Sequence, residues 1–68
     1  MLEMKKVEHE IFKNFFEGSN GSRQVTCILD NNCVRYIVRE NGKLKSRREY
    51  ENNKKDLCFK NAVKALNK

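Results

Sequence analysis

The sequence has no tryptophan, no proline and only three glycines in 68 residues. It also has no long apolar run, because charged residues interrupt the hydrophobic ones from Met1 to Phe16, so we expect neither a signal peptide nor a membrane-spanning helix. A chain of this length is expected to form one small domain over residues 1–68. Without tryptophan, its core must be built from four phenylalanines and aliphatic side chains.

Cysteine and histidine are too few and too scattered to indicate a metal site or a catalytic centre. Three cysteines, an odd number without a close pair, predict reduced thiols and a cytoplasmic location. The register derived below points Cys27 into the core and Cys33 away from it, so the two could not share a zinc ion. His9 has no partner residue at a catalytic spacing. We therefore expect no metal, no cofactor and no enzymatic activity.

Positive charge is abundant and unevenly distributed along the chain, whose net charge is +6. Residues 1–22 contain three lysines against four glutamates, a net charge of −1, whereas residues 23–68 contain twelve basic and five acidic residues, a net charge of +7. Such an asymmetry is typical of a protein that binds nucleic acid. The alternative interpretation is a basic surface that only keeps the protein in solution.

Residues 3–17 are expected to form a helix. Apolar residues recur there at intervals of three or four, as on one face of a helix. They are Met4, Val7, Ile11 and Phe15, with Phe12 and Phe16 beside them. Gly18 is expected to end the helix, and residues 19–22 to form a flexible connector.

Three strands are expected to follow. Apolar and polar residues alternate over Arg23–Asp30 and again from Val34 to Tyr50, and alternation places one set of side chains on a buried face. A two-residue Asn31-Asn32 turn aligns the first two strands. The resulting cross-strand pairs are Leu29 with Val34, Cys27 with Tyr36, and Val25 with Val38, all on the apolar face.

The turn between the second and third strands is expected to be longer. A two-residue Asn41-Gly42 turn would place charged residues of the third strand on the apolar face. A three-residue loop over 40–42 instead pairs Val38 with Leu44 and turns those charges outward. Only Arg48 then points inward, near an edge where its head group must extend to solvent.

The last helix is expected over residues 54–67. Asn53 is a suitable N-cap, and Asp56 in the first turn is favourable for the helix dipole. The expected buried stripe consists of Leu57, Cys58, Ala62, Ala65 and Leu66. The predicted fold class is therefore α+β with the order α-β-β-β-α, a three-stranded antiparallel meander with two helices packed on one face.

Two groups of cations are candidate contacts for nucleic acid. The first lies on the open sheet face and consists of Arg35, Arg39, Lys43, Lys45 and Arg47. In the predicted register Arg35 and Arg47 are cross-strand neighbours, an unfavourable arrangement unless an anion lies between them. The second group, Lys54 and Lys55, opens the last helix, where backbone N–H groups attract anions. The alternatives are arginines that only protect a sheet edge and lysines that are merely exposed.

These residues carry a resemblance to a known family. The stretch from Val38 to Lys43, the Lys54-Lys55 pair and the alanine-bearing segment 62–66 resemble a double-stranded-RNA-binding domain. In that family two lysines that open the last helix contact phosphates, a role that the resemblance implies for Lys54 and Lys55. The same strands and helix are also similar to the arm-type DNA-binding domains of phage integrases, which use the sheet face.

The expected function is therefore binding of duplex nucleic acid, DNA or RNA, through phosphate contacts from the open sheet face and the start of the last helix. The alternative is a small inhibitor or adaptor of the phage or mobile-element type that binds a protein such as a nuclease or defence complex. Ile28 and Ile37 would be its exposed anchors. A homodimer through a free sheet edge is a third possibility.

Overall fold

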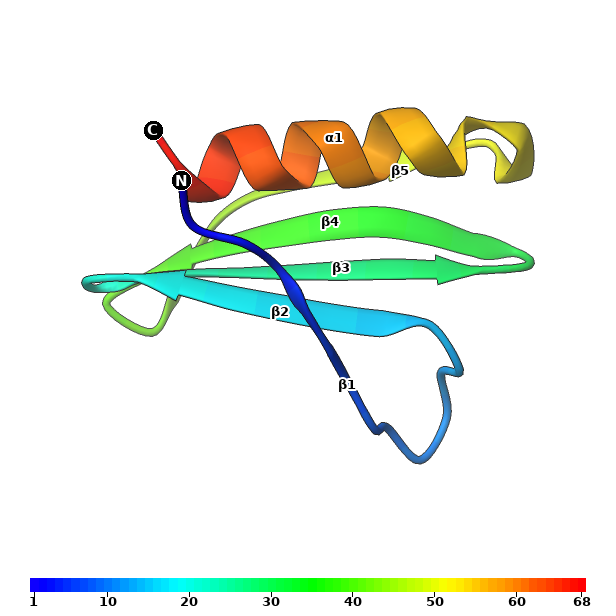
Figure 1. The fold of residues 1–68 in the computed structure, drawn as a ribbon, viewed down its shortest axis with the longest axis horizontal. Helices are drawn as coiled ribbons and strands as arrows, with labels where there is room; N and C mark the ends of the chain where they lie inside the picture. The colour runs from blue at the N-terminus through cyan, green and yellow to red at the C-terminus, as the bar shows by residue number, and fades with distance from the viewer.

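Five strands pair in chain order into one antiparallel sheet, and a single helix lies across one face of it (Figure 1). This computed structural model describes residues 1–68. The predicted order α-β-β-β-α is wrong, because the N-terminal helix is replaced by two strands. The strands are β1 (Lys5–Val7), β2 (Phe15–Asn20), β3 (Arg23–Asp30), β4 (Cys33–Glu40) and β5 (Lys43–Tyr50), followed by a short 3₁₀ helix, η1 (Asn52–Lys54), and by α1 (Lys55–Leu66).

The hairpin of β3 and β4 has the predicted register. Val25 lies opposite Val38, Cys27 opposite Tyr36, and Leu29 opposite Val34. The two-residue turn is confirmed as well, with Asn32 at a φ of 67°. Alternating apolar residues were sufficient here because a one-residue shift would have moved every one of them to the other face.

The helix predicted over residues 3–17 is wrong. Met4 is 9% exposed and belongs to the core, but Ile11 from the same supposed stripe is 76% exposed. Phe15 and Phe16 instead begin β2, in which Phe15 pairs with Ile28 of β3 and Phe16 lies on the helix side. A pairing partner for the second edge of β3 satisfies backbone groups that the predicted fold would have left open.

Gly18 ends no helix; it allows α1 to approach the sheet closely. A Cβ atom at Gly18 would lie 2.7 Å from Cδ2 of Leu66 and 3.1 Å from Sδ of Met4. The prediction of a flexible connector over residues 19–22 is also wrong, because these residues belong to the β2–β3 hairpin. Asn20 pairs with Arg23 across a tight turn, where Gly21 has a φ of 62°.

The turn between β4 and β5 has two residues, so the predicted three-residue loop is wrong. Asn41 and Gly42 both have positive φ, 53° and 79°, the conformation that a two-residue hairpin requires. A β-bulge in β5 then corrects the register: Val38 lies opposite Ser46, and Lys45 is the extra residue. The bulge resolves the conflict between a short turn and charged residues on the apolar face.

The two-residue turn and the bulge determine the faces on which Leu44 and Arg48 lie. Leu44 lies opposite Arg39 on the open face and is 61% exposed, so its predicted place opposite Val38 is wrong. Arg48 lies opposite Tyr36 on the helix side, as predicted, and its guanidinium carbon lies 5.4 Å from the centre of the Tyr50 ring. The contact resembles a cation–π interaction at a sheet edge.

The core is a single layer between α1 and the sheet. Of the predicted helix stripe, Cys58, Ala62 and Leu66 are fully buried, whereas Leu57 is 45% exposed. The small side chains of Cys58 and Ala62 let the helix axis approach the sheet. The sheet and the N-terminal segment contribute Met4, Val25, Cys27, Val34 and Val38.

The two ends of α1 are held by different means. Asn53 lies within η1, so its predicted role as N-cap is wrong, whereas Asp56 does lie in the first turn. At the C-terminal end, Nδ2 of Asn20 donates to the Leu66 carbonyl over 2.8 Å, and Nη1 of Arg23 donates to the Ala65 carbonyl over 3.0 Å. The β2–β3 hairpin thus satisfies carbonyl groups that have no partner within the helix.

Asp30 anchors the loop between β1 and β2. Its carboxylate accepts hydrogen bonds from the backbone N–H groups of Lys13 and Asn14, each at 2.9 Å, and from Nδ2 of Asn14 at 3.2 Å. Partial desolvation raises the pKa of Asp30, but these hydrogen bonds and the ammonium group of Lys55 outweigh it and hold the pKa below the ordinary 3.8.

Substituting Gly18→Ala should destabilise the fold by about 1–3 kcal/mol, because the new methyl group must displace the fully buried Leu66. Urea denaturation gives the difference in the free energy of unfolding. Ser19→Ala, on the neighbouring exposed position of β2, is the control and should change stability little. Equal stability of both variants would contradict the close contact between Gly18 and α1.

The hydrogen bonds to Asp30 should make stability depend on acid pH. The folded pKa is lower than the unfolded one, so the unfolded chain takes up the proton first as pH falls. The contribution is therefore present above about pH 4 and disappears as pH falls through the folded pKa. Asp30→Asn should remove this part of the pH dependence in denaturation between pH 2.5 and 7, whereas Glu8→Gln in the same loop should keep it.

Candidate nucleic-acid interface

The uneven distribution of charge along the sequence becomes an uneven distribution across the sheet. Because strand order follows chain order, β1 and β2 with a net charge of −1 over residues 1–22 lie at one edge of the sheet. The strongly basic remainder forms β3, β4, β5 and the helix. Among the strands, β5 is the most basic, with four cations against Glu49, and β1 carries Lys5 and Lys6 at the other edge of the sheet.

Arg39 and Arg47 are the two predicted contacts that lie free on the open face. Arg39 lies opposite Leu44, and Arg47 lies opposite Ile37, so the two arginines are diagonal neighbours on adjacent strands. Both are exposed, and neither forms an ion pair with a carboxylate. They carry the electrostatic character that the sequence predicted for this face.

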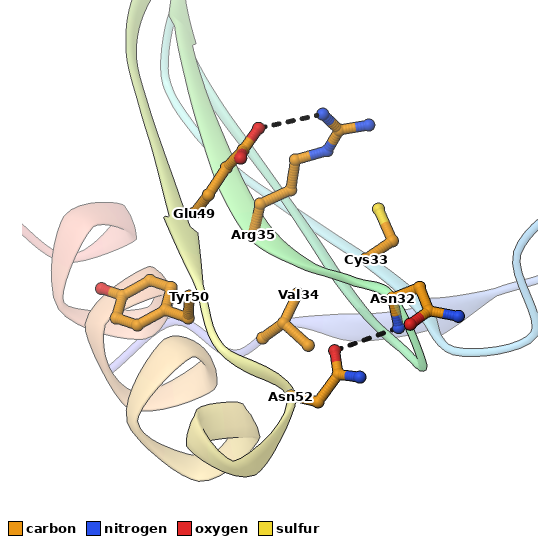
Figure 2. A pocket seen from close by; sticks show the side chains of 7 residues that line it. All are labelled: Asn32, Cys33, Val34, Arg35, Glu49, Tyr50 and Asn52. Atoms are coloured by element: carbon orange, nitrogen blue, oxygen red, sulfur yellow. Dashed lines mark hydrogen bonds and ion pairs between the residues drawn. The ribbon is translucent and has the colours of Figure 1, made fainter.

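Arg35, unlike Arg39 and Arg47, is paired with a carboxylate. Its cross-strand neighbour is Glu49, not Arg47, because the bulge shifts β5, so the predicted clash of two arginines is wrong. Figure 2 shows Nη1 of Arg35 directed at Oε1 of Glu49, 3.5 Å away, beside a pocket of about 220 Å³. Its Nε atom is buried without a hydrogen-bond partner. A carboxylate of the same chain already neutralises this guanidinium group.

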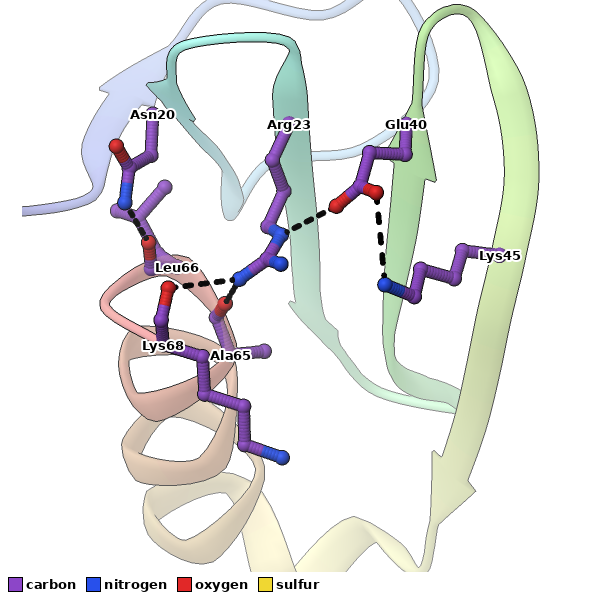
Figure 3. A network of polar contacts seen from close by, with 7 residues as sticks. All are labelled: Asn20, Arg23, Glu40, Lys45, Ala65, Leu66 and Lys68. Atoms are coloured by element: carbon purple, nitrogen blue, oxygen red, sulfur yellow. Dashed lines mark hydrogen bonds and ion pairs between the residues drawn. The ribbon is translucent and has the colours of Figure 1, made fainter.

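Lys45 has turned away from the open face. As the bulged residue it lies with Val38 and Ala65 beside a pocket on the helix side, and its Nζ is 3.5 Å from Oε2 of Glu40. Glu40 also accepts a hydrogen bond of 2.9 Å from Nε of Arg23, as Figure 3 shows. The bond from Arg23 and the charge of Lys45 hold the pKa of Glu40 below its ordinary value. These cations have a structural role, which the sequence did not predict for Arg23.

The remaining cations of the β4–β5 hairpin surround its edge. Lys43 opens β5, is exposed and forms no ion pair, and Arg48 extends over Tyr50 on the helix side. Since β5 pairs only with β4, its outer side is open to solvent. The exposed cations without a carboxylate partner here are Arg39, Lys43, Arg47 and Arg48, which we call the basic edge.

Lys54 ends η1 and Lys55 begins α1, and both elements follow the end of β5 that lies opposite Lys43. Figure 1 shows the start of α1 at the far end of the sheet from the β4–β5 turn. A strand of eight residues puts about 24 Å between the two ends. Lys54 is exposed and unpaired, but Lys55 is half-buried and donates from Nζ to Oδ1 of Asn31 over 3.0 Å. The structure thus separates the two predicted groups of contacts and leaves only Lys54 of the second group free.

The apolar residues of the open face do not form the anchors expected for a protein partner. Ile28 is only 4% exposed and Ile37 is half-buried, so the prediction of two exposed isoleucines is wrong for Ile28. On its β2 side Ile28 pairs with Phe15, whose ring stacks on His9 at a centroid distance of 4.5 Å. Leu44 is the large apolar side chain that remains exposed among the cations.

No cluster of three metal-ligating side chains is present, and Cys27 and Cys33 lie on opposite sides of the sheet. Nδ1 of His9 accepts a hydrogen bond from the backbone of Ile11 over 3.1 Å, so this ring is held by its own loop. Tyr50 packs against the core, and its hydroxyl accepts a hydrogen bond from Asn61.

Comparison with protein-family models, curated proteins and solved structures finds no match to this chain. The only helix of appreciable length, α1, is too short and too polar to cross a bilayer. The candidate interface therefore rests on geometry and charge alone.

Proposed function

We propose that this protein binds duplex nucleic acid through its phosphates, with the basic edge as the contact surface. The observation that carries the proposal is the set of four exposed cations on one hairpin that have no carboxylate partner. Nearby acidic side chains are already used: Glu40 by Arg23 and Lys45, and Glu49 by Arg35. The charge that remains on the hairpin is therefore available to an external polyanion.

The positions of these cations are costly in the free protein. Arg39 and Arg47 are diagonal neighbours on one face, close enough for long side chains of like charge to repel each other. A phosphate between them would reverse the sign of that interaction. Each phosphate neutralised also releases condensed counterions from the duplex, which favours binding at low salt.

The shape of the hairpin supports the duplex as ligand. β4 and β5 have eight residues each and end in a tight turn at the edge of the five-stranded sheet, so the cations on their open face and outer edge can follow a stretch of duplex backbone. Lys54, in η1 beyond the far end of β5, supplies a second point of contact. Contacts of this type position a duplex and carry little base specificity.

A protein partner is the second candidate, and Leu44 favours it. An apolar side chain that is 61% exposed near the turn of a basic hairpin resembles the anchor of an interface, and the outer side of β5 can accept an additional strand. Pairing of β5 with a second copy of itself would bring its own cations together, which opposes a homodimer through this edge.

Removing two charges from the basic edge should weaken nucleic-acid binding and its salt dependence. With four phosphate contacts, the logarithm of the binding constant should fall with the logarithm of salt concentration at a slope of about −3.6 for duplex DNA, and Arg39→Gln/Arg47→Gln should reduce the slope by about 1.8. Fluorescence anisotropy titrations with duplex DNA, duplex RNA and single strands measure the affinity and its salt dependence.

The matched control for this measurement is Lys5→Gln/Lys6→Gln, which removes the same charge from β1 at the far edge of the sheet. It should leave the slope almost unchanged. Equal losses in the two double variants would indicate attraction by net charge alone. Binding that is absent below micromolar concentrations, or insensitive to salt, would contradict the proposal and favour the protein partner.

Releasing Arg35 from its carboxylate should strengthen binding. Glu49→Gln removes the ion pair of 3.5 Å and adds a free guanidinium group next to the basic edge, so affinity for duplex DNA should rise severalfold. Glu8→Gln makes the same change in net charge in the β1–β2 loop and should have a smaller effect. The same anisotropy titration compares them, and lower affinity of Glu49→Gln would contradict a phosphate contact on this hairpin.

A further inference from the structure

Two cysteines meet at the centre of the core. Cys27 of β3 and Cys58 of α1 are both fully buried, and their Sγ atoms are 3.9 Å apart. They are separated by 31 positions in the sequence, and they bring the middle strand of the sheet into contact with the N-terminal third of the only long helix. As two thiols they contribute small, polarisable side chains to the core.

We propose that Cys27 and Cys58 form an intramolecular disulfide when the protein meets a peroxide, and that this reversible bond fastens α1 to the sheet. A disulfide joins two sulfur atoms at 2.03–2.05 Å. The two Sγ atoms therefore have to approach each other by about 2 Å, which requires small rotations of both side chains and no change in topology.

The third cysteine cannot compete for this pairing within one folded chain. Cys33 lies at the start of β4 on the open side of the sheet, beside Arg35, whereas Cys27 faces the helix. The sheet itself separates the two thiols. Only the Cys27–Cys58 pair is therefore positioned for an intramolecular bond.

Burial controls when the reaction takes place. Desolvation raises the pKa of both thiols, so in the closed fold they are neutral and poor nucleophiles. The first thiol reacts during a transient opening of α1, which exposes it to solvent and to the oxidant. Oxidation should accordingly be slow, and faster when mild denaturant promotes opening.

The reaction balances with one molecule of hydrogen peroxide. One thiolate attacks the peroxide, the O–O bond breaks, and a sulfenic acid and hydroxide form; the hydroxide takes up the thiol proton as water. The sulfur of the second thiol then attacks the sulfenic sulfur, the S–S bond forms, and the sulfenic oxygen leaves as a second water. The two thiols lose two electrons, which reduce the peroxide to water.

The bond should stabilise the fold, because it closes a long loop and so restricts the unfolded chain. For a domain of this size the expected rise in Tm is on the order of 10–20 °C. The increase should disappear when a reductant such as dithiothreitol is added, since exchange with a small dithiol restores both thiols.

The experiment uses the full chain with Cys33→Ser, which removes the partly exposed third thiol and intermolecular pairing through it, next to the unaltered protein. Each is treated with stoichiometric hydrogen peroxide and analysed by mass spectrometry, non-reducing peptide mapping and thermal melting. We expect a mass decrease of about 2 Da, a Cys27–Cys58 peptide and a reversible rise in Tm. The control Cys33→Ser/Cys58→Ala should show none of them.

Three outcomes would overturn the proposal: a disulfide that includes Cys33 in the unaltered monomer, oxidation of Cys27 or Cys58 to sulfinic acid without a crosslink, or a crosslinked protein that melts at a lower temperature than the reduced one. The measurements on the unaltered protein remain decisive if the control variant is too unstable to fold.

Discussion

The fold is built around the packing of α1 on β3 and β4. Cys58, Ala62 and Leu66 form one fully buried stripe of the helix, and the sheet receives it closely because Gly18 presents no side chain there. Only nine residues of the chain are buried, so this single layer supplies almost all of the hydrophobic stabilisation. Arg23 and the β2–β3 hairpin then hold the C-terminal end of the helix in place.

One helix can cover only one face of a sheet, and the other face is protected by different means. On the β2 side, the β1–β2 loop is tied to Asp30 and places His9 on the ring of Phe15. On the β5 side, Arg35 is neutralised by Glu49. Four of the cations that no carboxylate reaches, Arg39, Lys43, Arg47 and Arg48, lie on the β4–β5 hairpin, where a long edge strand would otherwise invite pairing with another chain.

The order of elements in the last two-thirds of the fold could be predicted from the sequence pattern, because β3 and β4 each have one face that must be buried. The first third could not. Met4, Val7, Ile11 and Phe15 recur at helical intervals by coincidence, and a pairing partner for β3 outweighed that local pattern. The bulge at Lys45 could not be predicted either. The Asn41-Gly42 sequence favours a two-residue turn, burial favours a register without charges on the apolar face, and only a distortion of β5 satisfies both.

For the candidate site, the residue types and their strands follow from local pattern: which segments are basic, and that β4 and β5 form a hairpin around Asn41 and Gly42. Which cations stay free depends on contacts between distant segments. Glu49 meets Arg35, and Lys45 turns to the helix side, only because one extra residue shifts the edge strand. Charge is a property of the chain, but its neutralisation depends on register, and register is determined when all five strands and the helix pack together.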